Sequence, residues 1–288
     1  MKRLSAWWFA PAPAERLAAL RIAIGGFALL YTLARHRALT AAYVGSFEAV
    51  GVIRMRVPSS LELAIVLATV VLLALFTLGV AYWLTAPLAA AALLWTLTYR
   101  SAWGQVFHVE DLLVLHVIAL AAAPAADAWA LARRREPNGS YGWAIKLLGA
   151  LTVATYVLAG IAKLRLAGWA WLDGDQLRNQ VAIDNARTLL LGGSPARLAL
   201  PLLAHPAWFT VASVATLAVE LAAPVALIGG RAGRCWALCA WLFHVGVYAL
   251  MHIVFPYALF GVAFLPWLCP DRWPDRWIAG MRGRGRRV

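Results

Sequence analysis

The chain has 288 residues, of which 63% are hydrophobic and 14% are charged, and its mean hydropathy is +0.73. A soluble domain of this length has roughly 45–50% apolar and about 25% charged residues, so the composition excludes a water-soluble globular protein. The net charge of +13 does not indicate a nucleic-acid partner, because the arginines cluster at segment ends, where membrane lipid is the expected partner. We expect an all-α integral membrane protein, a bundle of about eight transmembrane helices of ~20 residues. Residues 1–288 are expected to form a single domain, with no soluble domain.

Eight apolar segments predict the membrane helices. In chain order they cover residues 17–34, 61–84, 87–98, 107–123, 143–166, 207–229, 235–252 and 255–269. Residues 169–198 are the longest stretch outside these segments, and we expect a short surface or re-entrant helix within them. With eight spans, the distribution of basic residues between the two sides of the membrane favours both termini in the cytoplasm.

Glu220 is an acidic residue in the middle of the predicted sixth span. An ionisable side chain at that depth costs roughly 2.5–3.5 kcal/mol on insertion scales, so it needs a partner or a function. Ser213 and Thr216 lie seven and four residues earlier on the same helical face, which we expect to line the bundle interior. Two interpretations are open: an ion pair with an arginine such as Arg21 of the first span, or direct work on a substrate or proton.

Histidines mark the fourth and seventh segments. His108, Asp111 and His116 lie on one face of the fourth, where the carboxylate is positioned to fix the tautomer of His108 and raise its basicity. His244 and Tyr248 lie on a similar stripe of the seventh. Hydrogen-bonded packing is the alternative role for these histidines. A pair of haems does not fit, because eight residues rise only ~12 Å along a helix. We expect no metal.

Lys163 is the only lysine within an apolar context. The sixteen residues between Lys146 and Lys163 carry no charge, so both lysines have the positions of side chains that reach opposite membrane interfaces. The alternative is an amine in an apolar pocket, where the loss of solvation favours its neutral form and makes it a usable base.

A family resemblance emerges from four stretches in order. "YVLAGIAKLRLAGWAWLDG" resembles the pattern Y-x-x-A-G-x-x-K-L followed by W-x-x-G of vitamin K-dependent gamma-carboxylase and of its bacterial relatives, the horizontally transferred transmembrane (HTTM) domain proteins. "RLAALRIAIGGFALL", "VFHVEDLLVLHVIAL" and "LFHVGVYALMHIVFPYALFGVAFLP" are similar to other segments of this family. The resemblance covers residues from about 15 to 267, and it implies a bacterial inner-membrane location.

The resemblance assigns roles to particular residues. Lys163 matches the base that deprotonates the reduced quinone, His108 matches an essential histidine, and His244 matches a supporting one. The implied cofactor is a reduced vitamin K or menaquinone-type quinol, so a lipid quinone is a further partner. We expect these residues to contribute to substrate binding: His244, His116, Asp111, Tyr248, Trp171, Glu220 and Arg21.

The chain also departs from the carboxylase. The spacing from Lys163 to the W-x-x-G element is a few residues longer, and the large extramembrane domain that binds the peptide substrate is absent from this sequence. The implied function is therefore that of a carboxylase-like lyase, which uses a reduced lipid quinone and oxygen to deprotonate and carboxylate an unknown substrate. A separate protein is the expected source of a substrate-binding domain. The alternative is a non-catalytic membrane binding protein, carrier or complex subunit.

Overall fold

The described part of the chain is helical. The computed structural model describes residues 2–40, 53, 56–102, 108–131 and 140–268, and no strand occurs among them apart from an isolated bridge between Ala12 and Ser140. The chain divides into two compact units, Met1–Leu148 with Leu268–Val288, and Gly149–Trp267. The prediction of an all-α chain is confirmed for the described residues.

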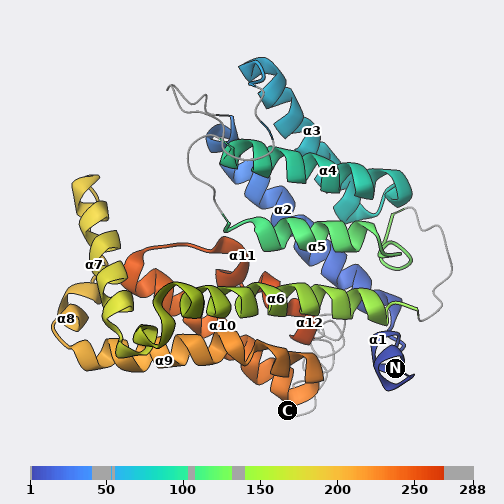
Figure 1. Ribbon diagram of the computed structural model, residues 1–288. Coiled ribbons are helices and arrows are strands. Elements are labelled where there is room, and N and C mark those ends of the chain that lie inside the picture. Colours follow the sequence, from blue (N-terminus) through green and yellow to red (C-terminus); the bar gives the residue numbers. More distant parts are fainter. Residues whose placement is uncertain (1, 41–52, 54–55, 103–107, 132–139, 269–288) are drawn as a thin grey trace, which may run out of the picture. The chain divides into compact units, whose positions relative to one another are not determined.

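Unit 1 is built from helices that pack in chain order. Its elements are α1 (Lys2–Trp8), α2 (Ala14–Leu39), α3 (Ser59–Leu78), α4 (Tyr82–Ser101), α5 (Asp111–Ala121) and the first part of α6 (Gly142–Ala167) (Figure 1). Helices α2 and α3, α3 and α4, and α4 and α5 contact each other in turn. Gly25 allows the close approach of α2 to α3, because a Cβ there would lie 2.6 Å from the Thr77 hydroxyl oxygen and 2.8 Å from the Phe76 ring. Small residues serve this purpose between membrane helices, where van der Waals contact drives association.

Unit 2 contains the rest of α6 and a more broken set of helices. These are η1 (Gly168–Asp173), α7 (Asp175–Leu190), α8 (Ala199–Leu203), α9 (Pro206–Leu221), η2 (Ala223–Ile228), α10 (Gly230–Met251), α11 (Pro256–Leu259), η3 (Val262–Phe264) and the start of α12 (Leu265–Leu268). The turn after η1 packs on the first turns of α9, where Thr210 donates a hydrogen bond to the Asp173 carbonyl (2.8 Å). Gly174 makes this contact with φ of 91°, and a Cβ there would overlap the backbone of Phe209 and Thr210.

Four described helical stretches are long and apolar enough to cross a membrane: Ala14–Leu39, Ser59–Leu78, Gly142–Asp173 and Gly230–Met251. The apolar helices Asp111–Ala121 and Pro206–Leu221 are shorter. The membrane class is supported by this finding, whereas the number of eight spans stays a prediction.

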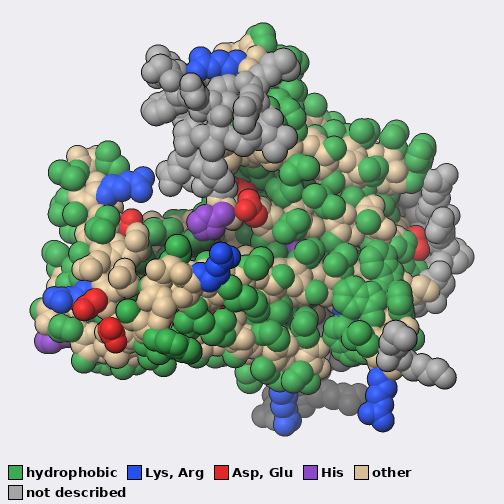
Figure 2. Space-filling model, viewed as in Figure 1, with side chains coloured by type: hydrophobic (Ala, Val, Ile, Leu, Met, Phe, Trp, Pro, Cys, Tyr) green, Lys and Arg blue, Asp and Glu red, His purple; other side chains and the backbone are tan. Residues whose placement is uncertain are grey.

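Hydrophobic side chains cover the surface of these helices. Leu30 on α2 is 66% exposed, and Val71 on α3 and Leu238 on α10 are 58% and 55% exposed. Figure 2 shows that hydrophobic side chains also cover most of the face in view. Large apolar patches of this kind mark a surface that contacts lipid or another protein rather than water.

Several predicted segments differ from the structure. The segment 61–84 is divided between α3 and the start of α4, and the segment 207–229 is divided between α9 and η2. Pro87 lies within α4 rather than at its start, because the helix begins at Tyr82; membrane helices tolerate proline where neighbouring groups satisfy the freed carbonyl. The predicted segment 255–269 is not one helix. Its described residues form the short helices α11, η3 and α12, separated at Gly261, whose φ of 77° is incompatible with a continuous α-helix. The predicted helix within residues 169–198 is confirmed as α7.

Candidate functional site

One face of α6 carries the polar residues of the signature sequence. Tyr156, Gly160 and Lys163 are four and three residues apart, which places them above one another on one side of the helix. Gly160 faces α9, and a Cβ at this position would lie 3.1 Å from the Cβ of Glu220 and 2.8 Å from the Leu221 side chain. The glycine therefore lets α9 approach α6 and brings Glu220 beside Lys163.

Lys163 and Glu220 form an ion pair in unit 2. The Lys163 Nζ donates to Glu220 Oε1 at 2.5 Å, and their side chains are 22% and 2% exposed. The same amine lies 5.4 Å from the centroid of the Trp171 ring. Lys163 is thus held between a carboxylate of α9 and an aromatic ring of η1, which favours the pocket interpretation over a side chain that reaches out to a membrane interface.

Four buried polar atoms of unit 2 have no hydrogen-bond partner among the described residues: Glu220 Oε2, Trp171 Nε1, Ser213 Oγ and, described below, His244 Nδ1. The first two belong to side chains that contact Lys163, and Ser213 is two helical turns before Glu220 on α9. Buried polar groups in folded proteins are nearly always satisfied by protein or by ordered water. An acceptor, a donor and an ion pair are therefore available here to a polar ligand or to water.

Tyr156 and His244 form a second polar contact in the core of unit 2. The Tyr156 hydroxyl and His244 Nε2 are 2.7 Å apart, and both side chains are buried. The His244 Nδ1 has no partner in the part of the chain that the structure describes. The imidazole lies edge-on to Phe243 and tilted against Phe255, with ring centroids 5.0 and 5.1 Å away. Aromatic rings thus surround His244, and its hydrogen bond with Tyr156 sets the orientation of the imidazole. Tyr156 is part of the signature sequence, but no role was predicted for it.

Glu220 was expected to pair inside the bundle with Arg21 or with a polar group of a neighbouring helix. It pairs with Lys163 of α6, so the second alternative is confirmed and Arg21 is not the partner. Arg21 belongs to unit 1, where it is completely buried and donates to the backbone carbonyls of these residues: Thr77 (3.2 Å), Ala125 (2.7 Å), Ala128 (3.3 Å) and Trp129. The guanidinium fork matches this cage of carbonyl oxygens, so Arg21 joins the end of α3 to the turns after α5.

The histidine stripe of the fourth segment is divided in the structure. His108 and Asp111 are exposed at the start of α5, whereas His116 is completely buried with its Nε2 3.0 Å from the Leu148 carbonyl oxygen. His116 therefore has the contacts of a packing residue. From the family matches we also expect Lys163, His108 and His244 to converge on one internal cavity. Because His108 belongs to unit 1 and the other two to unit 2, this convergence stays a prediction.

Glu110 was missed as an interacting residue by the sequence analysis. Its buried Oε1 accepts a hydrogen bond from the Tyr31 hydroxyl (2.5 Å) and lies 3.5 Å from Arg35 Nη1 and 3.7 Å from Arg100 Nη1. The cluster links α2, α4 and the start of α5, next to His108. Tyr31 and Arg35 are four residues apart on α2, but Glu110 is 79 positions from Tyr31, and no local pattern signals its contact with α2.

The remaining predicted residue, Tyr248, is 46% exposed and tilts against His252, with the ring centroids 5.8 Å apart. It lies one turn beyond His244 on α10, but the structure records no contact between Tyr248 and the Tyr156–His244 pair. Among the described residues, no group of three His, Cys, Asp or Glu side chains is arranged to hold a metal ion.

The sequence matches the HTTM domain family over residues 9–273. No match was found among curated proteins or among solved structures.

Proposed function

The chain belongs to the HTTM domain family, and on this basis we propose that it is a membrane enzyme of the carboxylase-like type. It would use a reduced lipid quinone and oxygen to deprotonate and carboxylate a substrate. The observation that carries the proposal is the Lys163–Glu220 ion pair, which places the family's basic residue in a partly buried site beside polar atoms that have no partner.

The polar atoms around Lys163 suit the headgroup of a reduced quinone. Glu220 Oε2 is an acceptor for a ring hydroxyl, Trp171 Nε1 is a donor to a ring oxygen, and the Trp171 indole offers a flat apolar face. These two residues and Lys163 would hold the group. When bound, the quinol supplies the electrons that, with oxygen, generate the strong base of the reaction.

Glu220 gives Lys163 a way to act as a base. Two charges in an apolar environment carry a large desolvation cost, which transfer of the shared proton from the amine to the carboxylate would remove. In that form the Lys163 amine is neutral and can accept a proton from a ligand. The Glu220 proton then passes to a water molecule, and the restored carboxylate stabilises the ammonium ion that has formed. Glu220 is thus the positioning partner of the base.

The test is oxygen consumption by the purified protein in lipid vesicles, with a reduced menaquinone analogue. Lys163→Ala should lower the rate by at least the hundred- to ten-thousand-fold typical of a lost general base. Lys146→Ala is the matched control, because Lys146 lies on the same helix and bonds to the backbone carbonyl of Trp7 in unit 1. Equal rates for the wild type and both variants would contradict the role of Lys163.

A second candidate is a non-catalytic membrane binding protein, carrier or complex subunit. The short Lys163–Glu220 contact favours it, because an amine neutralised by a carboxylate is also what a purely structural ion pair provides. Measurement of retained quinone separates the two. A binding protein keeps a quinone or another ligand unchanged, whereas the enzyme converts the quinol in the presence of oxygen.

We further propose a bacterial inner-membrane location with both termini in the cytoplasm, and a separate protein that supplies the substrate-binding domain. Reporter fusions at each terminus test the orientation. A reporter that is active only in the cytoplasm should be active at both termini. Affinity purification from membranes tests for the partner protein.

A further inference from the structure

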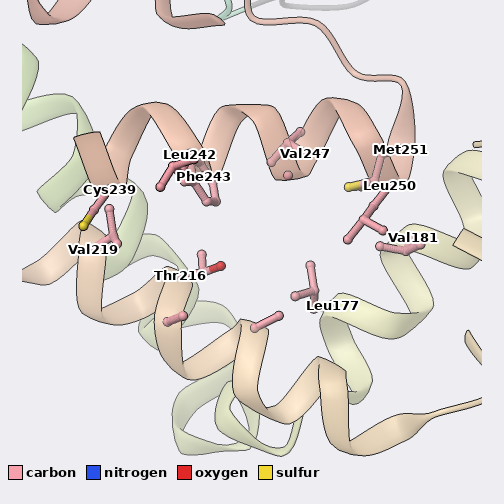
Figure 3. A pocket seen from close by; sticks show the side chains of 13 residues that line it. Leu177, Val181, Thr216, Val219, Cys239, Leu242, Phe243, Val247, Leu250 and Met251 are labelled. Atoms are coloured by element: carbon pink, nitrogen blue, oxygen red, sulfur yellow. The ribbon is translucent and has the colours of Figure 1, made fainter. Parts of the chain in front are cut away.

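An apolar cavity lies on a different side of α9 from Lys163. Its volume is about 380 Å³, and its walls come from α7, α9 and α10. Figure 3 shows Leu242, Phe243 and Val247 of α10 on one side, Thr216 and Val219 of α9 facing them, and Leu177 of α7 at one end. The cavity lies entirely within unit 2.

The lining of this cavity suits an aliphatic chain and no polar group. None of the thirteen lining side chains is charged, and apart from the Thr216 hydroxyl and the Cys239 thiol all of them are hydrocarbon, thioether or glycine. The Thr216 hydroxyl is one group in a long apolar wall. A headgroup would lose its hydration here without replacement hydrogen bonds, which is costly.

The cavity is distinct from the proposed quinol site. Consecutive residues on a helix point about 100° apart, so Val219 faces the cavity while Glu220 faces α6 and Lys163. Neither Lys163 nor Trp171 lines the cavity. The two sites therefore use adjoining faces of α9, with Thr216 between them, and are suited to different ligands, one polar and one hydrocarbon.

The mouth of the cavity joins the exposed apolar surface of α10. Cys239 and Leu242 line the cavity and are themselves exposed, Leu242 by 52%, and Leu238 beside them is 55% exposed. Helix α10 is a candidate membrane span, so this surface contacts the hydrocarbon chains of the bilayer. We propose that the cavity binds one acyl chain of a membrane phospholipid, which enters between α9 and α10.

This proposal does not depend on the proposed enzyme function. A chain that enters from the bilayer leaves one apolar medium for another, so packing rather than the hydrophobic effect retains it in the membrane. Once the bilayer is removed, the alternative environment of the acyl chain is water, and the hydrophobic effect then favours its retention in the cavity. The lipid should therefore stay with the protein through purification in mild detergent.

Two cysteines on α10 provide a direct assay. Cys239 lines the cavity, whereas Cys235, one helical turn earlier, is exposed and does not. Maleimide labelling, read by mass spectrometry for each cysteine, is performed on delipidated protein with and without dipalmitoyl phosphatidylglycerol, and in parallel with a menaquinone. The phospholipid should slow labelling of Cys239 severalfold and leave Cys235 unchanged.

Filling the cavity provides the second arm. Val219→Trp should prevent protection of Cys239 and lower photo-crosslinking to a diazirine-bearing palmitoyl phospholipid in vesicles severalfold. Leu238→Trp adds the same ring outside the cavity and should change neither. Protection of Cys239 by menaquinone but not by the phospholipid would overturn the assignment in favour of a quinone tail. Equal labelling of Cys239 with and without phospholipid would also overturn the proposal, because it would show that no acyl chain enters the cavity. The labelling of Cys239 in the wild-type protein tests the proposal even if Val219→Trp does not fold.

Discussion

The two units handle buried polar groups differently. In unit 1, the guanidinium of Arg21 donates to four backbone carbonyls, and the Glu110 carboxylate is contacted by Tyr31 and lies within ion-pair distance of Arg35 and Arg100. In unit 2, buried atoms of Glu220, His244, Ser213 and Trp171 have no partner among the described residues, although the first two side chains each make one short hydrogen bond. Satisfied networks hold helices together, whereas buried polar atoms without a protein partner are open to water or to a ligand.

The difference is one of degree. Unit 1 also contains a buried hydroxyl, Thr32 Oγ1, with no partner in the described chain. That hydroxyl stands alone on α2, however, whereas the unpartnered Glu220 and Trp171 atoms of unit 2 belong to residues that both contact Lys163. The comparison predicts that substitutions of buried charges in unit 1 mainly change stability, and that substitutions around Lys163 mainly change function.

The largest expected effect is on activity, from exchange of the ion pair in unit 2. Lys163→Glu alone places two carboxylates against each other and should unfold unit 2 or force one of them to take up a proton. The double variant Lys163→Glu with Glu220→Lys restores an ion pair, so the protein should fold. Its quinol oxidation should remain at least a hundredfold below wild type, because the amine has moved to α9. Full activity of the double variant would show that the pair is structural.

The next effect is on stability, from the arginine of unit 1. Arg21→Leu removes a guanidinium that serves four carbonyls, and breaking a buried charged network of this kind costs about 3–5 kcal/mol. Thermal unfolding in detergent, followed by circular dichroism, measures the loss. Arg165→Leu is the control, since Arg165 is exposed near the end of α6. A loss for Arg21→Leu no greater than for the control would mean that the hydrogen bonds of Arg21 to the four carbonyls do not stabilise unit 1.

A smaller loss is expected for the carboxylate cluster. Glu110→Gln keeps the shape of the side chain but removes its charge, and hydrogen bonds to charged groups contribute about 1.5–3 kcal/mol. The same unfolding assay applies. Asp111→Asn, at the neighbouring exposed position, should change the free energy of unfolding by much less. A larger loss for Asp111→Asn than for Glu110→Gln would mean that the contacts of Glu110 with Arg35 and Arg100 do not stabilise the fold.

The smallest expected effect on stability comes from the second polar contact of unit 2. Tyr156→Phe removes one hydroxyl and should cost about 0.5–1.5 kcal/mol, the typical net value of one hydrogen bond. It also leaves both imidazole nitrogens of His244 without a partner, which should change the chemical shifts of this histidine in NMR spectra. Tyr248→Phe is the matched control on an exposed ring. If both variants shift the His244 signals equally, the contact does not orient the imidazole.

Some elements follow from local patterns in the sequence. The apolar run at 17–34 corresponds to α2, and the run at 61–84 corresponds to α3 as far as Leu78, because long hydrophobic stretches favour one helix in lipid. Gly79, with φ of 72°, ends α3 before the predicted boundary. The segment 255–269 misled this reasoning, because Gly261 adopts a positive φ and interrupts the helix, a conformation that hydropathy does not report. For the site, the spacing of Tyr156, Gly160 and Lys163 is that of one helical face, an inference that the sequence analysis did not make.

The sequence by itself determined the membrane class, the family and the presence of a lysine and a carboxylate within apolar segments. These properties depend on composition and on residues close together in the chain. Only the tertiary structure decided that Glu220 pairs with Lys163 rather than with Arg21, and that His116 is a packing residue. The physical reason is that a buried charge selects its partner by distance and hydrogen-bond geometry across packed helices. The Glu220 carboxylate and the Lys163 amine, 57 positions apart in the sequence, meet because Gly160 lets α9 approach α6.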